Sequence, residues 1–139
     1  MNDRFKFRIW DEERENMFYL KDKDDYIEID CNRELIGYDT AGAWVGGHNC
    51  IPMQCTGLKD KNGKLIYEGD IVEVIPDKEY AVIKWNNESV RFDIRIKNST
   101  SIYRFTTFCG DELEVIGNIY ENPELLNSEE LGIRSQEWI

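Results

Sequence analysis

The stretch TGLKDKNGKLIYEGDIVEV, residues 56–74, decides the fold because it sets two turns around a short apolar run and then begins a strand. Asn62-Gly63 tolerates positive φ, so it predicts a type I′ turn and a tight hairpin. Glu68-Gly69-Asp70 predicts a second turn, in which Gly69 takes the unusual φ and the Asp70 carboxylate accepts hydrogen bonds from nearby amides. The stretch therefore indicates two well-formed turns rather than a catalytic motif.

Alternating apolar and polar residues predict strands on both sides of this stretch. Residues 4–11, 17–20 and 26–31 predict a three-stranded meander, and further strands are expected at 50–56, 80–85, 89–97, 101–108 and 111–120. Pro52 belongs at an edge or a strand start, and Gly117 suggests a bulge. In the strand over 89–97, the pattern points Val90, Phe92, Ile94 and Ile96 inward and Arg91, Asp93, Arg95 and Lys97 outward.

Residues 32–49 are rich in glycine and predict a loop with at most a short strand. Trp44 within it is either a cover over the core or an exposed contact. At the other end, Asn122 as N-cap and Pro123 at the first position predict a short helix that ends near Gly132.

The expected fold is mainly β, with one or more small SH3-like or partly open barrels, meander hairpins and a short C-terminal helix. We expect one β domain over residues 1–126. Within it, an N-terminal meander over 1–31 packs on a central barrel over 50–120, and residues 127–139 form a C-terminal tail.

The composition limits the classes of function. The chain has 139 residues, 41% of them hydrophobic, and a formal net charge of −11. This charge disfavours a general nucleic-acid binder and suits solubility or a protein partner with a basic surface. A membrane helix needs about 18 consecutive apolar residues, and the sequence has no such run. We therefore expect a cytoplasmic protein of a bacterial host, without a membrane partner, whose four cysteines are reduced.

The residues that bear reactive groups do not form a convincing catalytic or metal motif. His48, Cys50, Cys55 and Cys109 could be written as a zinc set, but they lack the paired cysteines of zinc knuckles. We expect packing roles for the cysteines, and no metal, cofactor or catalytic residue. An alternative is an enzyme that uses Glu68 and Asp70 with a divalent cation, although turn formation is the ordinary role of such residues.

One basic segment interrupts the acidic sequence: Arg91, Arg95, Lys97 and Arg104, with Trp85 and Tyr103 nearby. A solvated strand face is the first interpretation, because the outer faces of strands are normally charged. A weak single-stranded nucleic-acid binder, using Trp85, Arg91, Tyr103 and Arg104, is the second. A strand edge that pairs with another subunit is the third.

Three segments, KFRIWD (6–11), MQCTGLKDKNGKLIYEGDIVEV (53–74) and EVIGNIYENPELL (114–126), resemble the YopX family of small phage- and prophage-encoded proteins. The usual aromatic after the glutamine is Cys55 here. The resemblance implies a mostly β fold with barrel-like parts, a phage or prophage origin and a tendency to assemble, and it supplies no catalytic residue.

The sequence thus predicts a non-enzymatic binding or assembly module that associates with itself. Its candidate binding residues are Trp44, Tyr67, Asp70, Arg91 and Arg104.

Overall fold

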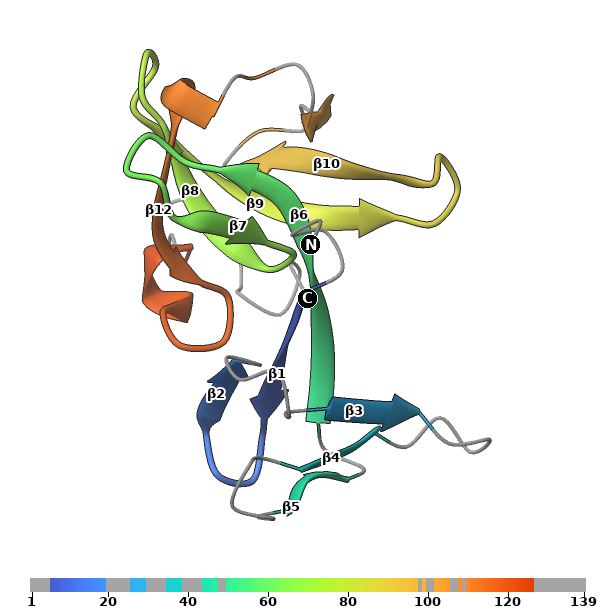
Figure 1. Cartoon of the computed structure of the whole chain (residues 1–139). Coiled ribbons are helices and arrows are strands. Elements are labelled where there is room, and N and C mark those ends of the chain that lie inside the picture. The colour runs from blue at the N-terminus through green and yellow to red at the C-terminus, as the bar shows by residue number, and fades with distance from the viewer. Residues whose placement is uncertain are drawn as a thin grey trace.

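The computed structural model describes residues 6–19, 26–29, 35–38, 44–47, 50–97, 99, 102–105, 108 and 110–126, with the backbone alone for the three segments between 26 and 47. The described elements are almost all strands (Figure 1). In chain order they are β1 (Phe7–Asp11), β2 (Asn16–Tyr19), β3 (Tyr26–Ile29), β4 (Leu35–Tyr38), β5 (Trp44–Gly47), β6 (Cys50–Lys59), β7 (Leu65–Tyr67), β8 (Asp70–Val74), β9 (Glu79–Asn86), β10 (Arg91–Ile96), β11 (Ile102–Arg104), η3 (Gly110–Glu112), β12 (Leu113–Asn118) and η4 (Pro123–Leu125).

The described strands form three antiparallel sheets with the orders β2-β1-β6-β7, β11-β10-β9-β8-β12 and β3-β4-β5. The hairpin of β1 and β2 and the strand at β3 were predicted, but the meander pairing was wrong, because β3 pairs with β4 and not with β2 among the described strands. The prediction of a loop with at most a short strand over 32–49 was also wrong, since this range contains both β4 and β5. Backbone pairing overrides the weak pattern there: Gly46 and Gly47 lie opposite Ile36 and Leu35.

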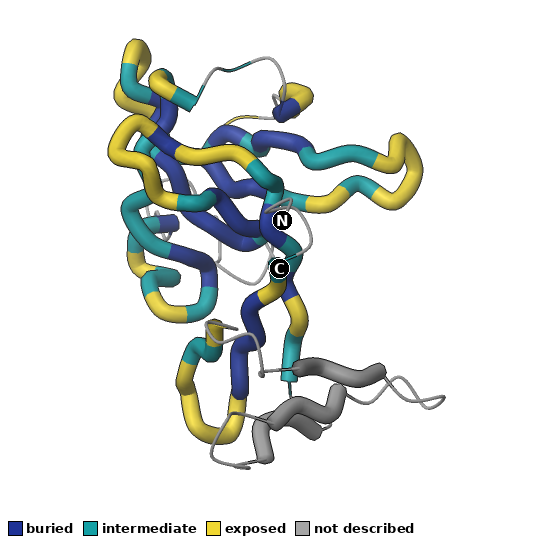
Figure 2. The backbone as a smooth tube through the Cα atoms, viewed as in Figure 1, coloured by how far each residue is buried: buried dark blue, intermediate teal, exposed yellow. Residues whose placement is uncertain are grey.

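The main core lies on one face of the five-stranded sheet and makes a partly open barrel, as predicted. Directly opposite residues share a face of an antiparallel pair, so Val72, Ala81 and Ile96 point the same way. They form one cluster with Ile66 of β7, which brings the four-stranded sheet over this face. Figure 2 shows the buried backbone concentrated where the two sheets meet.

A second, smaller core covers part of the opposite face. Ile71 and Val82 pack there against Ile119 and Leu126, from the segment that follows β12. Pro123 begins η4 as predicted, and the rest of the predicted helix lies outside the described residues. Asn122 is not the side-chain cap that we expected, because its Oδ1 accepts the Asn118 N–H at 3.2 Å instead.

The turn at Asn62-Gly63 is not of type I′, which requires positive φ at both central residues. Gly63 has φ of 81°, whereas Asn62 is not among the described residues with positive φ. The Asp60 side chain sets this turn instead. Its Oδ1 accepts the N–H groups of Asn62 and Lys64, each at 2.9 Å, and its Oδ2 accepts the Val115 N–H at 2.9 Å.

Three other local predictions are confirmed. Gly69 has φ of 85°, and the register between β8 and β12 shifts at Gly117. Pro52 lies near the start of β6, opposite Ile9, in a part of the strand that β7 does not pair with.

For the strand after Asn86, the prediction for Val90 was wrong, whereas Asp93 lies on the predicted outer face but is buried there. Val90 lies in the loop before β10, with φ of 51° and 69% of its surface exposed. Asp93 is 4% exposed because Asn86 Nδ2 and Arg91 Nε both donate to its carboxylate, at 2.8 and 2.7 Å. Hydrogen bonding to neighbours on its own face therefore removes it from solvent.

Candidate functional site

A buried ion pair links the two main sheets. Arg8 on β1 and Asp70 at the start of β8 approach to 2.8 Å, and each side chain is 2% exposed. The alternation of β1 directs Arg8 to the face where Tyr19 lies opposite on β2 and Met53 on β6. The predicted turn at Gly69 brings Asp70 to the same place.

The guanidinium of Arg8 is held from several sides. Nη2 donates to the Glu68 carbonyl at 3.0 Å, Nη1 reaches the Tyr19 hydroxyl at 3.5 Å, and the Tyr67 ring centroid lies 4.9 Å from Cζ. Nε has no hydrogen-bond partner among the described residues and is buried. One donor of this buried cation is therefore unused.

The surroundings shift the pKa values of the acidic groups. Burial raises the pKa of Asp70, opposed by the Arg8 charge and by the Tyr67 N–H, which donates to Asp70 Oδ2 at 2.7 Å. Burial likewise raises the pKa of Glu68. It raises the pKa of Tyr67 from its ordinary value near 10 to about 12.

These contacts give Asp70 a structural role. Arg8 occupies one oxygen of its carboxylate and the Tyr67 amide occupies the other. A divalent cation at Glu68 and Asp70 would have to displace Arg8, which would leave a buried unpaired charge. In the described part of the chain, no three His, Cys, Asp or Glu side chains gather as metal ligands.

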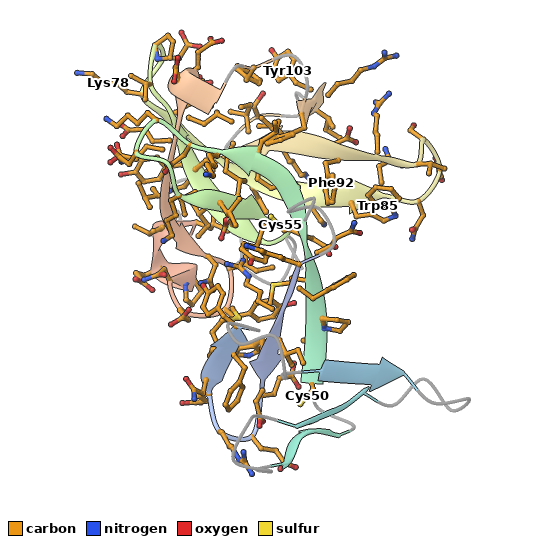
Figure 3. The ribbon with its side chains drawn as sticks, in the orientation of Figure 1. Cys50, Cys55, Lys78, Trp85, Phe92 and Tyr103 are labelled. Carbon is orange, nitrogen blue, oxygen red and sulfur yellow. The ribbon has the colours of Figure 1, made fainter. Side chains whose placement is uncertain are left out.

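The second candidate region is the projecting hairpin of β9 and β10 with the edge strand β11. Trp85 lies opposite Phe92, and their rings meet edge to face at 5.1 Å (Figure 3). Tyr103 lies opposite Ile94 and meets the Phe108 ring at 5.9 Å. Since Ile94 belongs to the main core, Trp85 and Tyr103 extend the inner face of the sheet.

The two candidate arginines lie on the other face. Arg104 is opposite Asp93 and Arg91 is opposite Asn86. Arg91 Nε is engaged by Asp93 at 2.7 Å, so part of its charge is already neutralised. The structure therefore does not bring the predicted stacking and phosphate-binding groups together on one surface.

The remaining sequence candidates are Trp44, His48 and the four cysteines, and the structure describes only some of them in full. Trp44 begins β5, where the structure describes the backbone. Cys55 is fully buried, as predicted for a small core residue, and its Sγ accepts the Gly57 N–H at 3.4 Å, whereas Cys50 is a free, partly buried thiol. His48, Cys31 and Cys109 lie outside the described residues.

Sequence reasoning missed Arg8 and Asp60 as organising residues. A strand that alternates Lys6, Arg8 and Trp10 predicts an ordinary outer face, yet Arg8 is 2% exposed and Trp10 is 8% exposed. The available signal was Asp70: a carboxylate beside a turn glycine and before an apolar strand needs a cationic partner if it is buried.

The described residues define a small, mainly β protein in which a partly open barrel is joined to further sheets. The model of the YopX protein family matches residues 6–127, and the chain belongs to this family.

Two solved structures resemble it. Protein yopX from Bacillus subtilis has a TM-score of 0.65 at 25% identity, over 91% of this chain and 100% of that one. Protein EF1440 from Enterococcus faecalis has a TM-score of 0.58 at 28% identity, over 88% of this chain and 97% of that one. Comparison with the curated proteins gave no match. Nor do the described residues include a helix long and apolar enough to cross a membrane.

Proposed function

We propose that this chain is a phage- or prophage-encoded, non-enzymatic assembly module that works in the cytoplasm and associates with itself through β11. The observation that carries the proposal is the open edge of the five-stranded sheet. β11 is the outermost strand, it pairs only with β10 among the described strands, and Ile102, Tyr103 and Arg104 are all exposed.

An exposed sheet edge offers unpaired N–H and C=O groups to another strand. The apolar surface around this edge adds to its attraction. Ile102 is 55% exposed, Tyr103 43% and Trp85 38%, and all three lie on β9 or β11. A neighbouring strand that paired with β11 would cover Ile102 on one face and Tyr103 on the other.

The pattern of β11 suits a second copy of the same strand. In an antiparallel pair centred on Tyr103, the two tyrosines lie opposite each other and each Ile102 lies opposite an Arg104. The arginines then do not face one another directly, and the aromatic pair is favourable across antiparallel strands. The cationic Arg104 also reduces, near the contact, the repulsion between two chains of net charge −11.

Light scattering coupled to size-exclusion chromatography tests this proposal. The monomer mass is 16.4 kDa, so the expected mass is at least twice that value and falls on dilution. Tyr103→Lys should shift the protein to a monomer, because a lysine at an edge opposes strand pairing. Leu58→Lys is the matched control, since Leu58 is also 43% exposed but lies on β6.

A monomer for the wild type at all concentrations would refute the self-association. An unchanged mass for Tyr103→Lys, or an equal loss of mass for Leu58→Lys, would refute β11 as its site.

A further inference from the structure

An open pocket of about 450 Å³ lies over the β2-β1-β6-β7 sheet and is separate from β11. Lys6, Arg8, Tyr19, Lys59, Lys64 and Tyr67 line it, together with Leu65 and Gly63. Every titratable group that the described residues contribute to this lining is a lysine, an arginine or a tyrosine. Such a concentration of positive charge is unexpected in a chain with 28 acidic residues.

The strand register explains how these side chains come together. Arg8 on β1 lies opposite Tyr19 on β2, and Lys59 on β6 lies opposite Leu65 on β7. Residues two apart on a strand share a face, so Leu65 and Tyr67 point the same way. Lys64 enters from the turn that Asp60 fixes, where its backbone N–H donates to the Asp60 carboxylate.

The positive charge of this pocket is only partly balanced within the protein. Asp70 pairs with Arg8 from within the fold at 2.8 Å. Lys59 and Lys64 are exposed and have no ion-pair partner among the described residues. The Tyr67 phenol is neutral at pH 7, as an ordinary tyrosine is, and burial raises its pKa further, to about 12, so it does not repel an anion.

Arg8 supplies the observation that points to a ligand. A guanidinium has five N–H donors, and buried polar groups are normally satisfied. Here the Arg8 Nε has no partner in the described part of the chain, and the Nη1 contact with Tyr19 Oη is long, at 3.5 Å. Nε itself is enclosed and does not reach a ligand, but an incompletely hydrogen-bonded cation in the lining of a lysine-rich pocket favours an oxygen-rich anion beside it.

We propose that this pocket binds a small organic phosphate, with the phosphate near Arg8, Lys59 and Lys64 and a flat apolar group against Tyr19 and Leu65. Several cations around one anion favour the multiple charge of phosphate over the single charge of a carboxylate. The exposed Tyr19 ring, which meets the Tyr67 ring edge to face at 5.8 Å, provides a rigid wall for the apolar group. The pocket volume is within the range of small-molecule sites.

Titration of the full chain by calorimetry and by amide NMR tests this assignment, with phenyl phosphate, inorganic phosphate, phenylacetate and phenol as probes. Phenyl phosphate should bind saturably, and about tenfold more tightly than inorganic phosphate because it buries a ring. It should also bind more tightly than phenylacetate, and phenol should not saturate. The amides of Gly63 and Leu65 should shift during the titration.

Variants of exposed residues keep the test independent of folding. Lys59→Gln and Lys64→Gln should each weaken binding of phenyl phosphate about three- to tenfold, as the loss of a nearby charge requires. Lys78→Gln removes the same charge from an exposed turn elsewhere and should leave binding unchanged. Thermal unfolding of each variant without ligand confirms that the fold persists.

Absence of saturable phosphate binding would overturn the proposal, and so would equal affinity of the wild type and both pocket variants. Tighter binding of phenylacetate than of phenyl phosphate would overturn the choice of phosphate. The inference is independent of self-association, because Tyr103→Lys lies on the other sheet and should bind phenyl phosphate as the wild type does.

Discussion

Asp70→Asn should be among the most destabilising single changes in this protein. The variant keeps the size of the side chain but leaves the Arg8 charge without its carboxylate. Both side chains are 2% exposed and approach to 2.8 Å, so water compensates little for the lost partner. Two charges about 4 Å apart interact by about 4 kcal/mol at an effective dielectric constant near 20. Removing one member of a buried pair typically costs about 3–5 kcal/mol, which agrees with that figure.

Urea unfolding followed by tryptophan fluorescence measures this cost. With a slope of about 2 kcal/mol per molar, the midpoint should fall by roughly 1.5–2.5 M. Asp93→Asn is the control: it also breaks an arginine pair, at 2.7 Å, but Arg91 is 35% exposed. Because water screens that pair, the control should lose about 1 kcal/mol or less from the pair itself.

A double-mutant cycle separates the ion pair from other effects of each substitution. Arg8→Met alone should be strongly destabilising, since Asp70 then becomes the unpaired buried charge. Arg8→Met combined with Asp70→Asn should cost less than the sum of the two single changes, by about 1 kcal/mol or more. Strict additivity, or a loss below about 1 kcal/mol for Asp70→Asn, would refute the view that this pair is tightly coupled and screened from solvent.

Three further predictions concern the turns that fix the sheets. Asp60→Asn should cost about 1–3 kcal/mol at pH 7, because Asp60 accepts three backbone N–H bonds. Burial would raise the pKa of Asp60, but the hydrogen bonds from the N–H groups of Val115, Lys64 and Asn62 outweigh it, so this pKa is lowered. The stability that the Asp60 carboxylate contributes is therefore present above the unfolded-state pKa and is lost as the pH falls through the folded-state pKa. Equal acid dependence of unfolding in the variant and the wild type would contradict this. Gly110→Ala should destabilise strongly in thermal melts, because a Cβ there would collide with the Lys59 carbonyl oxygen, and an unchanged melting temperature would exclude this packing. Gly117→Ala would place a Cβ 2.6 Å from Asn122 Oδ1, so Asn122→Ala in the same chain should restore part of the lost stability, whereas additive losses would contradict the contact.

Local backbone chemistry made much of this fold predictable. Gly69 and Gly117 stand where only a special φ or a bulge fits, and the structure has both. Strict alternation of apolar and polar residues, with a period of two, located β1 and β10, although both faces of β1 are buried. The mainly β class followed from the number of such segments.

The sequence could not show which strands pair or which polar groups are buried. β3 alternates as a third meander strand would, but its partner is β4, in which Gly37 interrupts the pattern. Arg8 contacts Glu68, 60 positions away, and one of the three Asp60 hydrogen bonds comes from Val115, 55 positions away, so no local pattern contains these contacts. The predicted nucleic-acid stacking site does not form for a related reason. Adjacent residues on a strand face opposite ways, which separates Tyr103 from Arg104.

The long reach of these contacts has a consequence for synthesis on the ribosome. The Arg8 guanidinium emerges 60 residues before the Glu68 carbonyl that it binds, which is a wait of about 3–12 s at usual elongation rates. The Asp60 carboxylate then lacks the Val115 N–H until a further 55 residues have been synthesised. The first strands of the nascent chain therefore lack some of these stabilising contacts until almost the whole barrel has left the exit tunnel.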